Sequence, residues 1–199
     1  MSEGGIILAH FAHLSSVLAL LDERRRFPVT LLAIDCHSAA GKSSFAHALQ
    51  RSRSTITVIH TDDFYRSMSE DIRAQLDAAG GYNQYYDWQR LETQVLRPLN
   101  SGTAARYQCY DWATNELGEW CEVQPRGVVV IEGCYAARPE LRAYYQLILL
   151  VTTSEEERCE RQLQRADEAD WVARWDAAER YYMEHHRPHE YADIIVSGE

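Results

Sequence analysis

A run of small and polar residues carries the clearest chemistry in this sequence. Its residues are Cys36, His37, Ser38, Ala39, Ala40, Gly41, Lys42, Ser43 and Ser44. They match the phosphate-loop pattern G-x-x-x-x-G-K-[ST] everywhere except at Cys36, which replaces the first glycine. Small residues let backbone N–H groups face phosphate oxygens, and the dipole of a following helix also favours an anion. We therefore expect residues 36–44 to bind ATP, with Lys42 reaching the β- and γ-phosphates and Ser43 ligating Mg²⁺.

The departure at Cys36 has a definable cost. If that position requires a positive φ, a residue other than glycine costs about 1 kcal/mol, which a folded domain tolerates. The alternative interpretation is a tight turn between a strand and a helix that contains Gly-Lys-Ser by chance. Because an apolar run precedes the loop, a helical segment follows it and small residues fill it, the sequence favours phosphate binding.

Acidic residues follow two other apolar runs. Asp62 and Asp63 come after residues 55–60, and Glu132 comes after Val128–Ile131. Ligands of a parallel sheet bind beyond the carboxyl ends of its strands, and successive side chains alternate in direction. One of the two aspartates could therefore act as a base or magnesium partner, although helix N-capping explains the pair equally well. Glu132 has the Walker-B position, which holds Mg²⁺ directly or through water.

The elements that must position these residues follow from the hydrophobic pattern. Apolar or β-branched runs predict strands, and helical spacing predicts helices. The expected strands are 29–34, 55–60, 128–131, 147–151 and, more weakly, 191–196. The expected helices are about 6–24, 43–50, most of 66–100 with a Gly-Gly-Tyr break at 80–82, and two within 154–187 that meet near 166–170. Residues 101–126 are expected to form an inserted loop or hairpin. Strands that alternate with helices predict an α/β fold, with a mainly parallel sheet covered on both faces, in one domain over 1–199.

The composition limits the classes of protein. The 199 residues carry a net charge of −10 and a pI near 5.3, which argues against a nucleic-acid partner. No apolar stretch is long enough to span a membrane, and the amino terminus does not resemble a signal peptide. The five cysteines form no C-x-x-C pair, which indicates free thiols and a cytoplasmic protein. Lys42 is the only lysine beside nineteen arginines.

Taken in order, these motifs resemble a known family. Ala33-Ile34-Asp35 leading into the loop, then Thr61-Asp62-Asp63-Phe64-Tyr65, then Ile131-Glu132-Gly133, are similar to the uridine kinase-like P-loop kinases. That group includes uridine–cytidine kinases, nicotinamide riboside kinases, phosphoribulokinase and bacterial pantothenate kinase. The resemblance covers about residues 29–196. It implies a three-layer P-loop NTPase fold with a short helical lid at about 155–175.

The resemblance also implies roles for single residues. Asp62 corresponds to the family's catalytic base and Glu132 to its glutamate near Mg²⁺. Tyr86-Asp87 resembles an aromatic–Asp pair that holds ribose hydroxyls, and Tyr110-Asp111-Trp112 resembles an element whose tyrosine lies near the base. Uridine kinases carry a histidine shortly after that element, where this sequence has Asn115 or a neighbour. This departure puts recognition of uracil or cytosine in doubt.

Three arginines fall where the family has its lid arginines: Arg158, Arg161 and Arg165. Arg161 and Arg165 are the stronger candidates for offsetting charge on the transferred phosphoryl group. The alternative is a solvated helix face, paired with the neighbouring glutamates.

The resulting expectation is a kinase that transfers the γ-phosphoryl group of ATP to a small-molecule hydroxyl, most readily the 5′-hydroxyl of a nucleoside. Its acceptor-site candidates are Asp62, Tyr65, Tyr86, Asp87, Tyr110 and Trp112. The other hypotheses are a kinase for another alcohol, such as nicotinamide riboside or pantothenate, and a regulatory protein that binds a nucleotide without catalysis. A homo-oligomer is left open.

Overall fold

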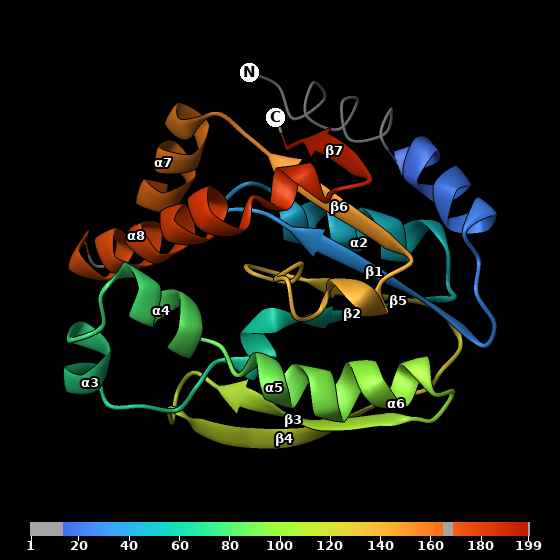
Figure 1. Cartoon of the computed structure of the whole chain (residues 1–199), viewed down its shortest axis with the longest axis horizontal. Coiled ribbons are helices and arrows are strands. Elements are labelled where there is room, and N and C mark those ends of the chain that lie inside the picture. Colours follow the sequence, from blue (N-terminus) through green and yellow to red (C-terminus); the bar gives the residue numbers. More distant parts are fainter. Residues whose placement is uncertain (1–13, 165–168, 199) are drawn as a thin grey trace.

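A five-stranded parallel sheet forms the centre of the molecule. The computed structural model describes residues 14–164 and 169–198. The sheet consists of β1 (Val29–Asp35), β2 (Ile56–His60), β5 (Gly127–Glu132), β6 (Leu147–Thr152) and β7 (Ile194–Ser197), in the order β2-β5-β1-β6-β7. All four pairings between neighbouring strands are parallel. The predicted α/β fold with a mainly parallel sheet is therefore confirmed (Figure 1).

The central strand β1 explains why the sheet has two cores. Every residue of β1 is buried, as its continuous apolar run predicted. Leu31 and Ala33 pack into one hydrophobic cluster, whereas Leu32 and Ile34 pack into another. Because side chains alternate along a strand, the two clusters lie on opposite faces of the sheet. Both faces are covered, as expected.

Helices and a hairpin cover these two faces. One cluster includes residues of a helix over 14–23 and of α2 (Lys42–Ser52). The other includes residues of α5 (Trp88–Leu91), η2 (Glu92–Leu96), α6 (Arg97–Asn100) and the hairpin strand β3 (Ala105–Asp111). Figure 1 shows α5, α6 and the hairpin on the side of the sheet away from α2. The first residues of the expected helix over 6–24 lie outside the described part of the chain.

Residues 101–126 form a hairpin, one of the two expected outcomes. Its strands are β3 (Ala105–Asp111) and β4 (Glu116–Val123), which pair antiparallel with an irregularity between Gln108 and Tyr110. The short helix η1 (Thr61–Phe64), which follows β2, contributes Phe64, whose ring stacks on Tyr107 of β3 at 5.0 Å. The hairpin is thereby connected to the end of β2.

The expected break at residues 80–82 is wrong. The segment instead forms α3 (Glu70–Ala74) and α4 (Ala78–Gln84), and α4 runs through both glycines. A Cβ atom at Gly81 would lie 2.8 Å from Tyr85 and 2.9 Å from Ala178. Gly81 is therefore needed for close packing between α4 and α8 (Ala169–His186), because glycine in a helix permits an approach that a side chain would block.

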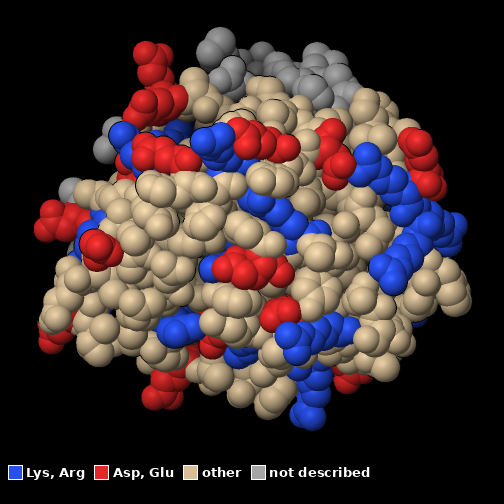
Figure 2. All heavy atoms as spheres, viewed as in Figure 1, with Lys and Arg blue, Asp and Glu red and all other residues tan. Residues whose placement is uncertain are grey.

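The remaining elements follow the expected order. α7 (Glu155–Gln164) and α8 are the two expected helices. Of the expected bend near 166–170, residues 166–168 lie outside the described ranges and residues 169–170 begin α8. Short 3₁₀ segments, η3 (Arg142–Tyr144) and η4 (Pro188–Glu190), precede β6 and β7. Among the described helices, none is both long and apolar enough to cross a bilayer. On the face in Figure 2, basic and acidic side chains are interspersed.

Candidate active site

The phosphate-loop segment lies between the carboxyl end of β1 and the start of α2. Gly41 caps α2 with φ 95°, and Ala39 has φ 61°, so both positions adopt the left-handed region. Cys36 is buried but is not among the residues with positive φ, so the anticipated strain does not fall on it. The replacement of the first glycine by Cys36 therefore causes no positive-φ strain at that position.

Ser43 and Glu132 meet at the carboxyl ends of the strands. Ser43 Oγ donates to the Glu132 carboxylate at 3.2 and 3.3 Å from its two oxygens. The His60 ring is also hydrogen-bonded to Glu132, and this bond raises the pKa of His60. Burial opposes the charged form of Glu132, but the hydrogen bond with His60 and the charge of Lys42 outweigh it and lower the Glu132 pKa. One hydroxyl and one ionised carboxylate are oxygen ligands of the kind that Mg²⁺ accepts.

Lys42 remains charged beside these groups. Burial disfavours its ammonium form, but the net effect of the surroundings raises the pKa of Lys42 well above its usual value. The carboxylates of Glu132 and Asp62 are among the groups that raise it. A cation held next to the loop amides suits a phosphate group.

Asp62 and Asp63 have different hydrogen-bond partners, although they lie in the 3₁₀ helix η1 and not in a strand, so strand alternation is not the reason. Asp62 is exposed and accepts a hydrogen bond from the Tyr86 hydroxyl at 2.9 Å. Asp63 instead accepts from the Tyr107 hydroxyl at 3.3 Å, away from the loop. Neither side chain caps a helix, because η1 begins after His60 without a side-chain cap. Burial raises the pKa of Tyr86 well above its usual value, so this hydroxyl stays protonated and donates to Asp62.

A cleft of about 110 Å³ joins the loop to Asp62. Its walls come from seven separate parts of the chain. The lining residues are Ser38, Lys42, Asp62, Tyr86, Trp112, Cys134, Gln162, Trp171, Val172 and Trp175. The cleft therefore combines a cation, a carboxylate and several aromatic rings within one space.

The other predicted acceptor residues lie behind this wall or away from it. Tyr65 is buried and stacks on Trp112 with ring centroids 4.6 Å apart. The Tyr110 hydroxyl donates to Asn115 at 2.7 Å, and the Tyr110 ring meets Trp112 edge-on. Asp87 caps α5 through the Arg90 amide at 3.1 Å and does not line the cleft. The role of Asp87 in holding ribose stays a prediction.

The predicted lid arginines have separate placements. Arg161 donates to the Ala39 carbonyl of the loop at 3.2 Å and pairs with Glu157 at 2.8 Å. Arg158 is buried and pairs with Asp176 of α8 at 2.7 Å, so it connects the two helices and does not line the cleft. Arg165 lies outside the described residues.

Helix α8 supplies several site residues that the sequence reasoning missed, among them Val172 of the cleft wall. Trp171 and Trp175 line the cleft, and Glu179 accepts hydrogen bonds from the backbone N–H of Ser38 at 3.0 Å and from its hydroxyl. The His37 ring also lies 3.3 Å from Glu179 and so turns to this carboxylate. Burial opposes charge on Glu179, but these hydrogen bonds outweigh it and lower the Glu179 pKa. The spacing of four residues between Trp171, Trp175 and Glu179 was a signal for one helix face.

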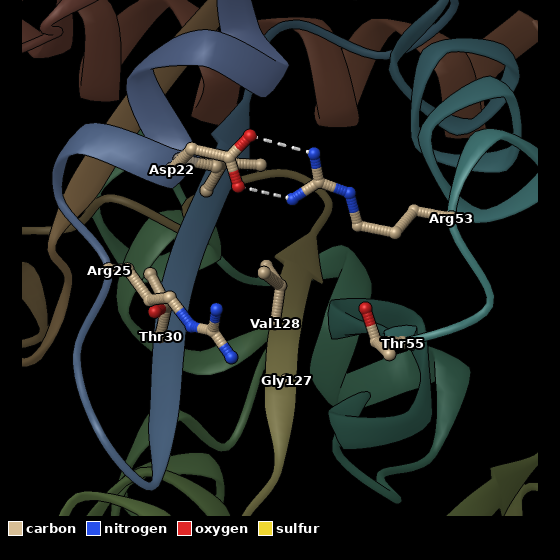
Figure 3. Close-up of a pocket in the computed structure, with 8 residues that line it drawn as sticks. Asp22, Arg25, Thr30, Arg53, Thr55, Gly127 and Val128 are labelled. Carbon is tan, nitrogen blue, oxygen red and sulfur yellow. Dashed lines mark hydrogen bonds and ion pairs between the residues drawn. The ribbon is translucent and has the colours of Figure 1, made fainter.

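A second cavity lies at the opposite edge of the sheet. Its volume is about 300 Å³, and it is lined by residues near the amino ends of β1 and β5. Figure 3 shows Asp22 and Arg53 in a two-bond ion pair above it, with Arg25 pointing into the space. It contains neither the loop nor the strand-end acids, so we assign the candidate active site to the cleft at Asp62.

Comparison with known proteins identifies the family. The model of the phosphoribulokinase / uridine kinase family matches residues 31–171. The chain belongs to this family. It is therefore a kinase, and enzymes of this family generally use ATP with Mg²⁺.

Solved structures show the same fold at low sequence identity. A possible uridine kinase from Bacillus stearothermophilus aligns with a TM-score of 0.75 and 20% identity, over 94% of this chain and 97% of that one. D-glycerate 3-kinase from Cryptococcus neoformans var. grubii serotype A aligns with a TM-score of 0.57 and 15% identity, over 91% and 87% of the two chains. These likenesses confirm the expected P-loop kinase fold.

Proposed function

We propose that this kinase transfers the γ-phosphoryl group of ATP to a primary hydroxyl of a small molecule, with a nucleoside as the leading acceptor. The observation that carries the proposal is the cleft itself. Lys42 and Ser38 of the loop line one wall, and Asp62 lines the same space. A phosphate-binding loop and a candidate base that share one cleft are what phosphoryl transfer to an alcohol requires.

Each group then has a task. Asp62 accepts the proton of the attacking hydroxyl, and the Tyr86 hydroxyl orients the Asp62 carboxylate through its 2.9 Å hydrogen bond. Lys42 offsets negative charge on the transferred group. Ser43 and Glu132 would hold Mg²⁺, which when bound neutralises charge on the phosphate oxygens. Arg161 lies next to the loop and would contribute after leaving the Ala39 carbonyl.

The nature of the walls supports a nucleoside as acceptor. Tyr86, Trp112, Trp171 and Trp175 present aromatic rings to the cleft. Such rings stack on planar bases. The cleft is smaller than the several hundred Å³ of typical ligand pockets, so a nucleoside requires the rings of α8 to move away from Trp112. Closure of the same rings would exclude water and limit ATP hydrolysis.

A second acceptor class also has a specific observation in its favour. Asp87, the residue expected to hold ribose hydroxyls, binds the Arg90 amide and lies 3.5 Å from the Arg66 guanidinium. An alcohol without a ribose, such as pantothenate, would not need Asp87 in the cleft.

A panel assay tests both classes. The purified protein is incubated with Mg-ATP and individual nucleosides, nicotinamide riboside, pantothenate or other alcohols, and ADP release is measured. We expect stimulation by one nucleoside. Stimulation only by an acceptor without an aromatic ring would overturn the nucleoside proposal. ATP binding without stimulation by any acceptor would favour the regulatory hypothesis.

Asp62→Asn tests the proposed base directly. Because the amide cannot accept the proton, we expect acceptor phosphorylation to fall by about 10² to 10⁴-fold while ATP affinity changes little. Asp63→Asn is the matched control, since Asp63 faces Tyr107 and should leave the rate within a fewfold of wild type. Equal losses in both variants would contradict the assignment of Asp62.

A further inference from the structure

Two cysteines lie in contact across the hairpin. Cys109 belongs to β3 and Cys121 to β4, and their Sγ atoms are 2.6 Å apart. Both side chains are half-buried, and both pack against the cluster that contains Tyr107. The two thiols therefore lie on the same face of the hairpin, although twelve positions separate them in the sequence.

The strand register explains this contact. Cys121 lies opposite Tyr107, and the register shifts between Gln108 and Tyr110. Cys109 lies in this irregular stretch, diagonally across from Cys121. Diagonal neighbours on one face of an antiparallel pair remain within reach of each other's side chains, and a bulge redirects the bulged side chain. The contact therefore follows from backbone pairing and does not require a distorted hairpin.

We propose that Cys109 and Cys121 are a modification site at which a disulfide oxidant, such as oxidised glutathione, forms an intramolecular disulfide in the folded protein. In the first step, Cys121 attacks the oxidant, forms a mixed disulfide and releases one glutathione thiol. In the second step, the Cys109 sulfur displaces the second glutathione thiol and forms the Cys109–Cys121 bond. The two cysteines together lose two electrons and two protons, and the oxidant is reduced to two thiols.

Proximity matters because Cys109 is a poor nucleophile by itself. Burial and the neighbouring thiol raise the pKa of Cys109 to about 12, so little thiolate is present near neutral pH. The second step is intramolecular, and two groups held in contact react with a high effective concentration. Oxidation is therefore expected to accelerate as the pH rises, since thiolate is the reacting form.

The hairpin also carries two rings of the candidate acceptor site. Tyr110 follows Cys109 directly, and Trp112 lines the cleft. A bond between the strands would restrict movement of these rings. This consequence rests on the proposed function, and it predicts that oxidation changes the KM for the acceptor more than the KM for ATP. The disulfide itself is tested without any activity measurement.

The decisive experiment is mass analysis of the intact protein after incubation with reduced or oxidised glutathione at controlled pH. We expect a mass decrease of two hydrogen atoms, no retained glutathione, and loss of two thiols from alkylation. Arg106 and Arg126 flank one tryptic peptide with both cysteines, and cleavage after Glu116 or Glu119 separates them into two linked fragments. We also expect the oxidised form to unfold at a temperature about 5 °C higher, since the crosslink restricts the unfolded chain.

Matched variants separate this pair from the other thiols. Cys109→Ser and Cys121→Ser should each abolish the linked fragments, whereas Cys159→Ser, at an exposed position of α7, should leave them unchanged. Retention of glutathione on either hairpin cysteine would overturn the proposal, because the second step would then have failed. Linkage of Cys159 between two molecules without the Cys109–Cys121 product would overturn it as well.

Discussion

At the scale of single residues, the ammonium group of Lys42 is the most specific feature of the candidate site. It is the only lysine among the twenty lysine and arginine residues, and it lies between Gly41 and Ser43 at the start of α2. An ammonium group is compact and strongly hydrated, whereas a guanidinium is a wide planar fork. The space beside the loop amides therefore suits the ammonium group better than a guanidinium.

Lys42→Arg tests whether shape matters beyond charge. We expect the KM for ATP to rise or kcat to fall by about tenfold or more, although the charge is unchanged. Steady-state kinetics at varied ATP would measure this. Arg51→Lys, an exposed exchange on the same helix, is the control and should have no effect. A fully active Lys42→Arg protein would show that only positive charge is required there.

At the scale of elements, α8 contacts both the aromatic wall of the cleft and the phosphate loop. It places Trp171 and Trp175 in the cleft, and its Glu179 accepts hydrogen bonds from Ser38. The buried pair of Arg158 with Asp176 connects α7 to the same helix. Movement of α8 would therefore change both the aromatic wall and the phosphate loop.

Glu179→Gln tests the contact between α8 and the loop. The exchange removes charge from a buried acceptor of charge-assisted hydrogen bonds, which are worth about 1.5 to 3 kcal/mol each. We expect the KM for ATP to rise about tenfold, with a smaller change in the KM for the acceptor. Glu184→Gln, on an exposed position of α8, serves as the control. An unchanged KM for ATP would mean that Glu179 does not position the loop.

Close packing of α4 on α8 has its own test in Gly81→Ala. The new Cβ would lie 2.9 Å from the Ala178 Cβ, so we expect a loss of about 1 to 3 kcal/mol in the free energy of unfolding. Gly80→Ala is the less crowded exchange: its Cβ would lie 3.0 Å from Asp77 Oδ1, which caps the helix, and 3.3 Å from Leu76, and alanine gains helix propensity, so we expect a smaller loss. Urea unfolding of both variants measures the difference, and equal stabilities would refute the packing argument.

At the scale of the whole molecule, one buried carboxylate connects three distant segments. Asp35 accepts hydrogen bonds from the Tyr135 and Ala137 amides and from the Tyr182 hydroxyl of α8. Burial raises the pKa of Asp35 to about 6, against the effect of these hydrogen bonds. The folded protein therefore binds a proton at Asp35 more tightly than the unfolded chain does.

This shift predicts a pH dependence of stability. The contribution is complete below the unfolded pKa of 3.8 and is lost as the pH rises through about 6. Between about pH 5 and about pH 7.5, wild type should lose about 1 to 1.5 kcal/mol in the free energy of unfolding relative to Asp35→Asn. Urea unfolding of both proteins across this range measures the difference in slope. Parallel pH profiles would show that Asp35 titrates normally.

The sequence by itself determined the sheet and the position of the candidate site. The apolar runs that end in Asp35, His60 and Glu132 predicted buried parallel strands. Since parallel strands end at one edge, the motifs that follow them had to meet there. Local order along the chain was sufficient for this inference because strand burial and loop composition are local properties.

The tertiary structure decided which side chains meet at that edge. Asp62 lines the cleft, whereas Asp63 contacts Tyr107 and Asp87 lies outside the cleft. Trp175, from a distant helix, lines the same cleft as Asp62. The tertiary structure also joined Cys109 to Cys121 through a shift in strand register that the cysteine spacing did not reveal. These contacts depend on how distant helices and strands pack against each other, and periodicity along one segment carries no information about its partner in space.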